Sequence, residues 1–303
     1  MKTPLIIEQH IHGAFGIDFN KVSEPNDILA LADKLLRCGI GGFFPTLVTD
    51  SVENIKRQIS IIKQAAKSCP RILGIHLEGI FINSKKKGIH NPEHFMALSS
   101  ENYKLIEDDF IKIVTLAPEL DEGLLDYLRT KGVKIQAGHC IGGDLSKVNG
   151  TTHTFNAMSG VNHRAESTTL SALINDNIYS EIIADGIHIN DDALKLFFKS
   201  KPKNKVLLVS DALPITYSDL TETVFADSKI YYDGKKATSK DGTIAGSTTL
   251  LDKVIKILAN KGMFDVQYIE NPYNYHNITP CGEIIWDKNW NISQVIYNGQ
   301  EIL

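Results

Sequence analysis

Apolar runs of strand length alternate along this chain with segments in which apolar residues recur at helical spacing. The strand-like runs are Leu5–Ile11, Gly42–Leu47, Ile72–Leu77, Phe110–Leu116, Val133–Ala137, Thr151–Phe155, Ile178–Ala184 and Val206–Ser210. Short, nearly continuous apolar runs are typical of parallel strands that are buried on both faces. Eight such strands separated by helices over about 250 residues predict a (β/α)8 barrel of the TIM type.

The sequence also predicts where one of the helices begins. Asp50 is followed three residues later by Glu53, a spacing that predicts a capping box at the beginning of the helix whose buried stripe contains Ile55 and Ile59. A doubly wound open sheet is the alternative architecture, but no glycine-rich fingerprint follows the first strand. The pattern therefore favours the closed barrel.

The last part of the chain does not follow this alternation of strands and helices. Phe225–Gly246 contains two Asp-Gly turns and predicts a β-hairpin excursion, and Glu283–Trp286 begins a strand-like tail. We expect a barrel domain over residues 1–270, including the excursion near 225–246. Residues 271–303 are expected to form a C-terminal β remnant packed on the barrel.

Composition narrows the classes of partner. The chain has 303 residues, 43% of them hydrophobic, and a formal net charge of -4, so no global basic field recruits nucleic acid or an anionic membrane. An anionic substrate must then be held by a local cluster of donors. The four cysteines are widely spaced without a CxxC pair, and the N-terminal apolar run is too short for a signal peptide or a membrane span. We expect a cytoplasmic enzyme.

Ligand-type side chains gather at the predicted carboxyl ends of the strands, where barrel enzymes place their catalytic groups. His10 and His12, two residues apart on one strand, face the same side and can share a metal ion. Glu78 closes a very apolar strand, where a buried carboxylate needs either a metal or a basic partner. The full set is His10, His12, Glu78, His139, His153, Asp185, His188 and Asp211.

Each of these residues alone has an ordinary structural explanation. His139 and His153 could be hydrogen-bonded core histidines, and Asp211 could be a helix N-cap. Independent structural roles do not explain why five of the eight strand ends carry His10, His12, Glu78, His139, His153 or Asp211, so together these residues predict a metal site. A divalent ion lowers the pKa of a bound water to about 7. Asp211 is then the candidate proton shuttle, and His188 could stabilise a developing oxyanion or orient the substrate.

These residues fall within ten short motifs that resemble, in order from residue 5 to about residue 260, those of the N-acetylglucosamine-6-phosphate deacetylases. The motifs are His10–Gly13, Pro45–Thr49, His76–Gly79, Lys87–Pro92, Thr115–Glu119, Ala137–His139, Thr152–Gly160, Ala184–His188, Ser210–Ala212 and Ala245–Thr248. The resemblance implies hydrolysis of the acetamide of N-acetylglucosamine 6-phosphate to glucosamine 6-phosphate and acetate, a step of amino-sugar catabolism.

The resemblance also implies roles for single residues. Glu78, His139 and His153 would hold the main metal, and His10 and His12 a second, so one or two divalent ions are expected. Zinc is the first expectation, with iron or another divalent ion as the alternative. Asp211 would be the acid/base residue. The residues implied in substrate binding are His90, Asn91, Asn156, Ala157 through its backbone, His188 and Ser247, the last in the segment that borders the acetyl pocket.

Arg164 resembles the phosphate-binding arginine that a neighbouring subunit supplies in this family, which implies a homodimer. The chemistry agrees, because an arginine can bind a phosphate through two parallel hydrogen bonds. Without the resemblance, His163-Arg164 could equally be a solvated loop.

Several departures from the family pattern concern the pocket and the small domain. The family normally places about fifty residues of β structure before the His-x-His strand, whereas this sequence starts at that strand, so the small β domain is expected to be a reduced remnant. Ile80 stands in place of proline, Ala165–Thr168 replaces the Pro-Gly after the arginine, and Glu8 replaces an aspartate. These changes spare the ligands, so the reaction type is a firmer prediction than the substrate.

Two alternatives stay open at this point. The first is an amidohydrolase that acts on a different small amide or N-acetyl amino sugar, which would share every metal ligand. The second is a non-catalytic metal-binding protein, which would have no need for the proton shuttle Asp211.

Overall fold

The computed structural model describes residues 1–303, and its centre is a ring of eight parallel strands. In ring order they are β2 (Ile6–Ile11), β5 (Ile40–Leu47), β6 (Ile75–Glu78), β7 (Ile111–Leu116), β8 (Lys134–Ala137), β9 (Gly150–Thr151), β10 (Tyr179–Ile182) and β11 (Val206–Leu208). The ring closes just beyond β11, where Asp211 N donates to His10 O over 2.9 Å and His12 N donates to Ala212 O over 2.9 Å. The predicted barrel is therefore confirmed.

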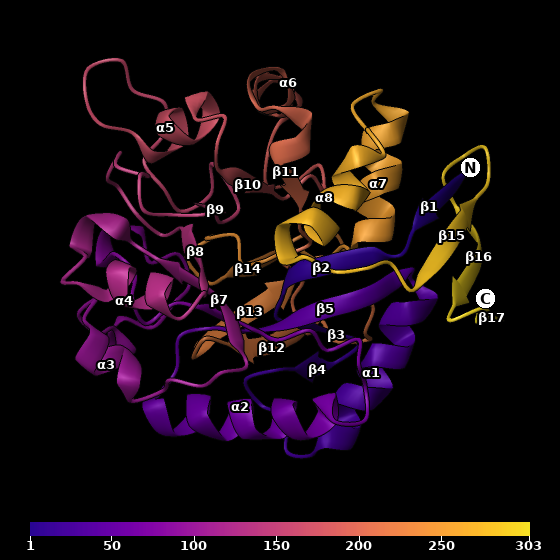
Figure 1. Cartoon of the computed structure of the whole chain (residues 1–303), viewed down its shortest axis with the longest axis horizontal. Coiled ribbons are helices and arrows are strands. Elements are labelled where there is room, and N and C mark those ends of the chain that lie inside the picture. The colour runs from indigo at the N-terminus through magenta and orange to yellow at the C-terminus, as the bar shows by residue number, and fades with distance from the viewer.

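Helices surround the strands, as Figure 1 shows. They bury their apolar stripes against the ring in one core cluster of 62 residues, which is how amphipathic helices stabilise a barrel. The helices are α1 (Pro25–Arg37), α2 (Val52–Ala66), α3 (Ser100–Lys104), α4 (Leu124–Thr130), α5 (Thr168–Ile174), α6 (Asp191–Ser200), α7 (Leu251–Asn260) and α8 (Gln267–His276).

Two sequence-based boundaries differ in the structure. The predicted start of α2 at Asp50 is wrong, because the Ser51 hydroxyl is the cap and accepts the Asn54 amide over 3.2 Å, while Asp50 accepts the Asn54 side chain. The sixth strand is also shorter than the predicted Thr151–Phe155. It ends at Thr151 because the following residues turn away from the strand direction, with His153 at a φ of 29°.

The predicted β excursion is a three-stranded antiparallel sheet of β12 (Glu222–Phe225), β13 (Ser228–Tyr232) and β14 (Ala237–Ser239). Its inner face packs Phe225, Ile230 and Ala237 against Val48 and Leu213 at the carboxyl ends of the barrel strands. The excursion therefore forms a wall over the mouth of the barrel. Two further short strands, β3 (Gly13–Ala14) and β4 (Ile17–Asp18), make a tight hairpin directly after β2.

The two ends of the chain meet in one small antiparallel sheet at the edge of the barrel (Figure 1). Its strands are β1 (Lys2–Pro4), β15 (Gly282–Trp286), β16 (Ile292–Tyr297) and β17 (Gln300–Glu301). The boundary expected at residue 270 falls inside α8, which continues to His276. That helix packs on the barrel, where the Tyr273 hydroxyl donates to Leu5 O over 2.6 Å.

All four cysteines are free in the structure. None of the helices combines the length and the apolar character that crossing a membrane requires.

Candidate metal centre

Six side chains from five different strand ends converge at the mouth of the barrel, and none is more than 8% exposed. Their convergence follows from the closed ring, because parallel strands of a barrel all end on the same face. The six residues are His10, His12, Glu78, His139, His153 and Asp211.

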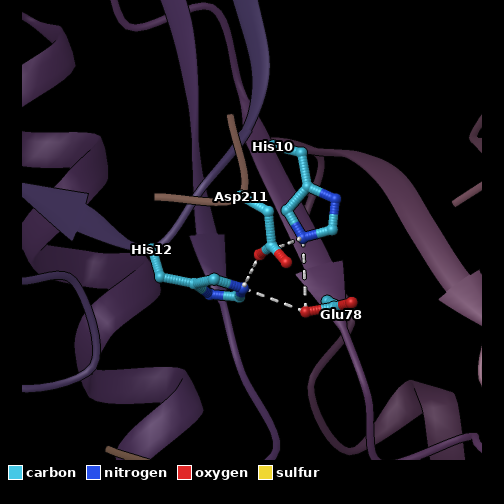
Figure 2. A group of neighbouring side chains, drawn as sticks. All are labelled: His10, His12, Glu78 and Asp211. Atoms are coloured by element: carbon cyan, nitrogen blue, oxygen red, sulfur yellow. Dashed lines mark ion pairs between the residues drawn. The ribbon is translucent and has the colours of Figure 1, made fainter. Parts of the chain in front are cut away.

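Glu78 lies between two groups of donors. Its Oε2 is 3.0 Å from His12 Nε2 and 3.3 Å from His10 Nε2, and Asp211 Oδ1 lies 3.1 Å and 3.4 Å from the same two nitrogens. Figure 2 shows these four side chains pointing toward one another. We call this group the first position.

On the other side, Glu78 Oε1 is 2.9 Å from His153 Nε2 and 3.2 Å from His139 Nε2. The two imidazole nitrogens are themselves 3.2 Å apart. We call Glu78, His139 and His153 the second position. Because each carboxylate oxygen faces a different group, Glu78 bridges the two positions.

These spacings fit divalent metal ions. Ligands at 2.0–2.1 Å around a tetrahedral zinc ion lie about 3.3 Å from one another, close to the distances in both positions. The Nδ1 atoms of His12 and His139 face the backbone oxygens of Thr46 and Lys86, which only accept hydrogen bonds. Both Nδ1 atoms must therefore carry the proton, which leaves the Nε2 lone pairs facing carboxylate oxygens. The buried Nε2 of His10 has no hydrogen-bond partner at all. A cation between these atoms satisfies every one of them.

The electrostatics of the site also favour positive charge. Burial by itself would lower the pKa of His12, but hydrogen bonds to Asp211 and Glu78 raise it to about 9. Burial likewise opposes a proton on His10, yet the charges of Glu78 and Asp211 hold the pKa of that ring well above its ordinary value. The field that favours protons on these imidazoles also favours a divalent cation in their place.

Backbone strain accompanies the ligands. His139, His153 and Asp211 have φ values of 49°, 29° and 53°, in the left-handed region that costs a non-glycine residue of order 1–3 kcal/mol. Gly79 has a φ of 112°, and a Cβ there would lie 2.0 Å from the Thr49 hydroxyl oxygen. Glycine is therefore required directly after Glu78. Sharp turns at the strand ends aim the ligands inward.

A pocket of about 520 Å³ opens above the ligands, within the size range of small-molecule sites. Among the predicted substrate-binding residues, His90, Asn156, Ala157 and His188 line it. Burial and the nearby charge of His139 lower the pKa of His90, so its ring is neutral, with Nδ1 2.7 Å from the Thr49 hydroxyl.

His188 has a different environment. Its Nδ1 is 2.8 Å from Asp185 Oδ2 and its Nε2 is 3.0 Å from Ala245 O. Both partners accept hydrogen bonds, so the ring donates from both nitrogens. Although burial lowers the pKa of His188, the hydrogen bond and charge of Asp185 outweigh it and raise the pKa. A cationic donor therefore stands at the wall of the pocket.

Three other predicted substrate residues do not line this pocket. The Asn91 amide donates to Asp227 Oδ2 over 3.0 Å, and Ser247 is buried with its hydroxyl against the backbone of Thr249. Arg164 is exposed on the loop between β9 and α5.

Reasoning from sequence missed several residues of the site. Lys85, Lys86 and Lys87 line the pocket, although only Lys87 falls within a quoted motif. Glu181 is fully buried on β10 and bonds to His10 Nδ1 over 3.0 Å. A charged residue inside the predicted strand Ile178–Ala184 was the signal that could have identified it.

A closed parallel barrel with this set of histidines and carboxylates at its carboxyl face defines a metal-binding amidohydrolase. No model of a known protein family matches the chain. N-acetylglucosamine-6-phosphate deacetylase from Bos taurus is 31% identical over 280 residues, which are 84% of this chain and 68% of that protein. The chain therefore belongs to the N-acetylglucosamine-6-phosphate deacetylase family.

Other similarities set the scope of that assignment. The enzyme of the same name from Bacillus subtilis (strain 168) is 31% identical over 262 residues, 80% of this chain and 66% of that protein, so the chain spans about two thirds of the length of these relatives. N-acetylgalactosamine-6-phosphate deacetylase from Shewanella sp. (strain ANA-3) is 27% identical over 266 residues, 84% of this chain and 68% of that protein.

The fold agrees with these sequence similarities. The structure of N-acetylglucosamine-6-phosphate deacetylase from Thermotoga maritima superposes with a TM-score of 0.91 at 25% identity, covering 100% of this chain and 88% of that one. A Mycobacterium smegmatis deacetylase in complex with N-acetyl-D-glucosamine-6-phosphate has the same fold at 21% identity. Its TM-score is also 0.91, over 100% of this chain and 87% of that one.

Proposed function

We propose that this chain hydrolyses the acetamide of a phosphorylated N-acetyl amino sugar, with N-acetylglucosamine 6-phosphate as the first candidate substrate. The products are then glucosamine 6-phosphate and acetate. The observation that carries the proposal is the pocket itself, whose floor joins the Glu78-bridged ligands to Asp211 and whose walls hold His90 and His188. The relatives named above support this choice of substrate.

The proposed cofactor is one or two divalent ions, with zinc as the first candidate and iron or another divalent ion as the alternative. Imidazole and carboxylate ligands of the two positions suit all of these metals. When bound, such an ion polarises the amide carbonyl and lowers the pKa of the attacking water.

The protein side chains supply the proton transfers and the orientation. Asp211 lies at the edge of the first position and opens to the pocket, where its carboxylate can take a proton from the attacking water. The same group then delivers that proton to the leaving nitrogen, which departs as the free amine while the acyl carbon leaves as acetate. His188, held by Asp185, places a cationic ring at the wall of the pocket, and its Nε2–H would stabilise the carbonyl oxygen once it exchanges Ala245 O for the substrate.

Recognition of the phosphate is proposed to involve the rim of the pocket. Lys85, Lys86 and Lys87 stand there without an ion-pair partner among the carboxylates of the chain. Unpaired lysines around a pocket attract a phosphate dianion, and they supply the local cluster of donors that an acidic protein needs.

Arg164 is proposed to bind the phosphate in the pocket of a second subunit. Its exposed loop is free to reach the pocket of a neighbouring subunit in a homodimer. Mixing Asp211→Asn chains with Arg164→Ala chains tests this arrangement, because a hybrid dimer regains one intact site. Recovered activity in the mixture is the expected result, and a mixture as inactive as its components contradicts the shared site.

A second candidate substrate is N-acetylgalactosamine 6-phosphate. The Shewanella relative carries that name, and Ile80 together with Ala165–Thr168 departs from the motifs of the glucosamine enzymes. An amidohydrolase that acts on another small amide is the remaining alternative, since it would use the same ligands.

The deciding experiment measures acetate release by the metal-quantified protein from both phosphosugars and from N-acetylglucosamine, beside an Asp211→Asn control. We expect release from N-acetylglucosamine 6-phosphate that falls about 10²- to 10⁴-fold in the control. Faster release from the galacto substrate reassigns the sugar. No release from any of the three, with metal bound, sinks the proposed substrate class.

A further inference from the structure

A carboxylate that takes no part in the proposed chemistry lies directly beneath the metal centre. Glu181 on β10 is 0% exposed and accepts three hydrogen bonds. Its Oε1 accepts from Gln9 Nε2 over 2.5 Å, while its Oε2 accepts from His10 Nδ1 over 3.0 Å and from His153 N over 3.1 Å. One side chain therefore touches a ligand residue of each metal position.

The far side of Glu181 is anchored to helix α8. His276 Nε2 lies 2.8 Å from Gln9 Oε1, so the Gln9 amide accepts from His276 and donates to Glu181. The His276 ring also packs against Phe44 at 4.4 Å between ring centres. These contacts fix both ends of Gln9 and hold the carboxylate of Glu181 in one orientation.

The charge of Glu181 has no lysine or arginine partner. His10 is its only ion-pair partner, and no lysine or arginine lies within 4.0 Å of it. Burying a carboxylate without a compensating charge is strongly unfavourable. The positive charge that compensates Glu181 must therefore come through the His10 ring, from whatever cation that ring binds.

The geometry at His10 matches that need. Because Nδ1 donates to Glu181, Nε2 carries the lone pair and faces Glu78 and Asp211 at the first position. A carboxylate on the outer nitrogen of a metal-binding histidine fixes the tautomer and the ring orientation and makes the ligand more basic. The contact to His153 is different, because it reaches only a backbone amide and leaves that ring untouched.

We propose that Glu181 is a positioning residue that sets the metal affinity of the first position by acting through His10, with Gln9 and His276 holding its carboxylate. With both positions filled, the chain carries two divalent ions. The inference rests on the metal-dependent function proposed above, but its test is metal binding rather than turnover.

The test compares metal-free wild-type protein with Glu181→Gln by titration of Zn²⁺ against a chromophoric chelator. We expect two ions per wild-type chain. In the variant, the affinity of one ion falls about 10- to 100-fold, which is typical when a metal-binding histidine loses its outer hydrogen-bond partner, while the other ion is retained. Thermal unfolding of the metal-free variant measures the stability of the fold separately from metal binding.

Glu8→Gln is the matched control. Glu8 is equally buried beside the site, but its two oxygens accept only the backbone amides of His10 and Ser210. This variant is expected to bind Zn²⁺ like the wild type. An equal loss of affinity in both variants would show a general effect of altering a buried carboxylate and overturns the specific role of Glu181.

A double substitution tests whether Glu181 acts through His10. In a His10→Asn background, Glu181→Gln should cause no further loss of Zn²⁺ affinity, since the ring through which it acts is gone. An additive loss overturns action through His10. If Glu181→Gln lowers the unfolding temperature of the metal-free protein but leaves both affinities intact, the residue is structural and the proposal is wrong. Failure of acetate release alongside the expected binding changes rejects the substrate and not this role.

Discussion

The floor and the rim of the pocket are built in opposite ways. The six ligands of the floor are buried and sit at strand ends that belong to the closed ring. The rim consists of Lys85–Lys87, of which only Lys86 is half-buried. Nearby, Asp227 follows the pocket residue Phe225 by two positions and contacts Asn91 and His94 at the surface.

The difference separates two properties of the molecule. Ring hydrogen bonds and the core hold the floor, so the type of chemistry cannot change without disturbing the barrel. Rim residues can change without that cost, so we expect substrate choice to depend on the loops. Substitutions in the floor, in the rim and away from the pocket test this difference.

The largest effect is expected at the centre of the floor. Glu78→Gln keeps the shape of the side chain but removes the charge shared by both positions. We expect loss of metal and a fall in kcat/KM of about 10³-fold or more, because a metal contributes several kcal/mol of charge stabilisation in the transition state. Metal content and acetate release measure the two effects together. A variant that keeps both ions would refute the bridging role of Glu78.

A smaller effect is expected at the basic rim. Replacing Lys85, Lys86 and Lys87 by alanine should raise KM for a phosphorylated substrate about tenfold and change kcat little, because lost rim charges weaken binding rather than chemistry. The unphosphorylated sugar is the internal control, and its KM should stay the same. An equal rise for both sugars would mean that the lysines shape the pocket and do not recognise phosphate.

A still smaller effect is expected where the rim segments touch. Asp227→Ala removes the acceptor of the Asn91 amide and the ion pair with His94, both at the surface. One exposed contact contributes about 1 kcal/mol or less, so KM should rise at most about fivefold, with metal content unchanged. Steady-state kinetics checks this expectation. A large fall in kcat would show that rim and floor are coupled.

The smallest effect on activity is expected from a buried polar group away from the pocket. Lys201 is 3% exposed, and its Nζ donates to Ala172 O and Asn175 O at the end of α5. Lys201→Met leaves two carbonyls unsatisfied, at about 1–3 kcal/mol each, and should lower Tm by several degrees. The value of kcat/KM below the transition should not change. Parallel loss of activity would contradict the confinement of function to the floor and rim.

The features that could be predicted from the sequence are those that depend on neighbouring residues. Hydrophobic runs and helical spacing are properties of neighbouring residues, so they predicted the eight barrel strands and the closed ring. The side chains of His10 and His12 alternate with that of Ile11 along one strand, so their common direction followed from strand geometry alone. Boundaries were less secure, since Ser51 rather than Asp50 caps α2 and only the real backbone decides which oxygen reaches the amide.

Contacts between distant segments were decided only by the tertiary structure. Nothing in the sequence tells that Glu78 divides its two oxygens between two groups of histidines, or that Glu181 reaches His10, 171 residues away. The same holds for the rim, where Lys85 and Lys86 line the pocket while Asn91 turns to Asp227. Residue types and strand ends are encoded locally and determined the kind of chemistry. The direction of each loop side chain depends on packing between remote parts of the chain, and only the folded barrel supplies it.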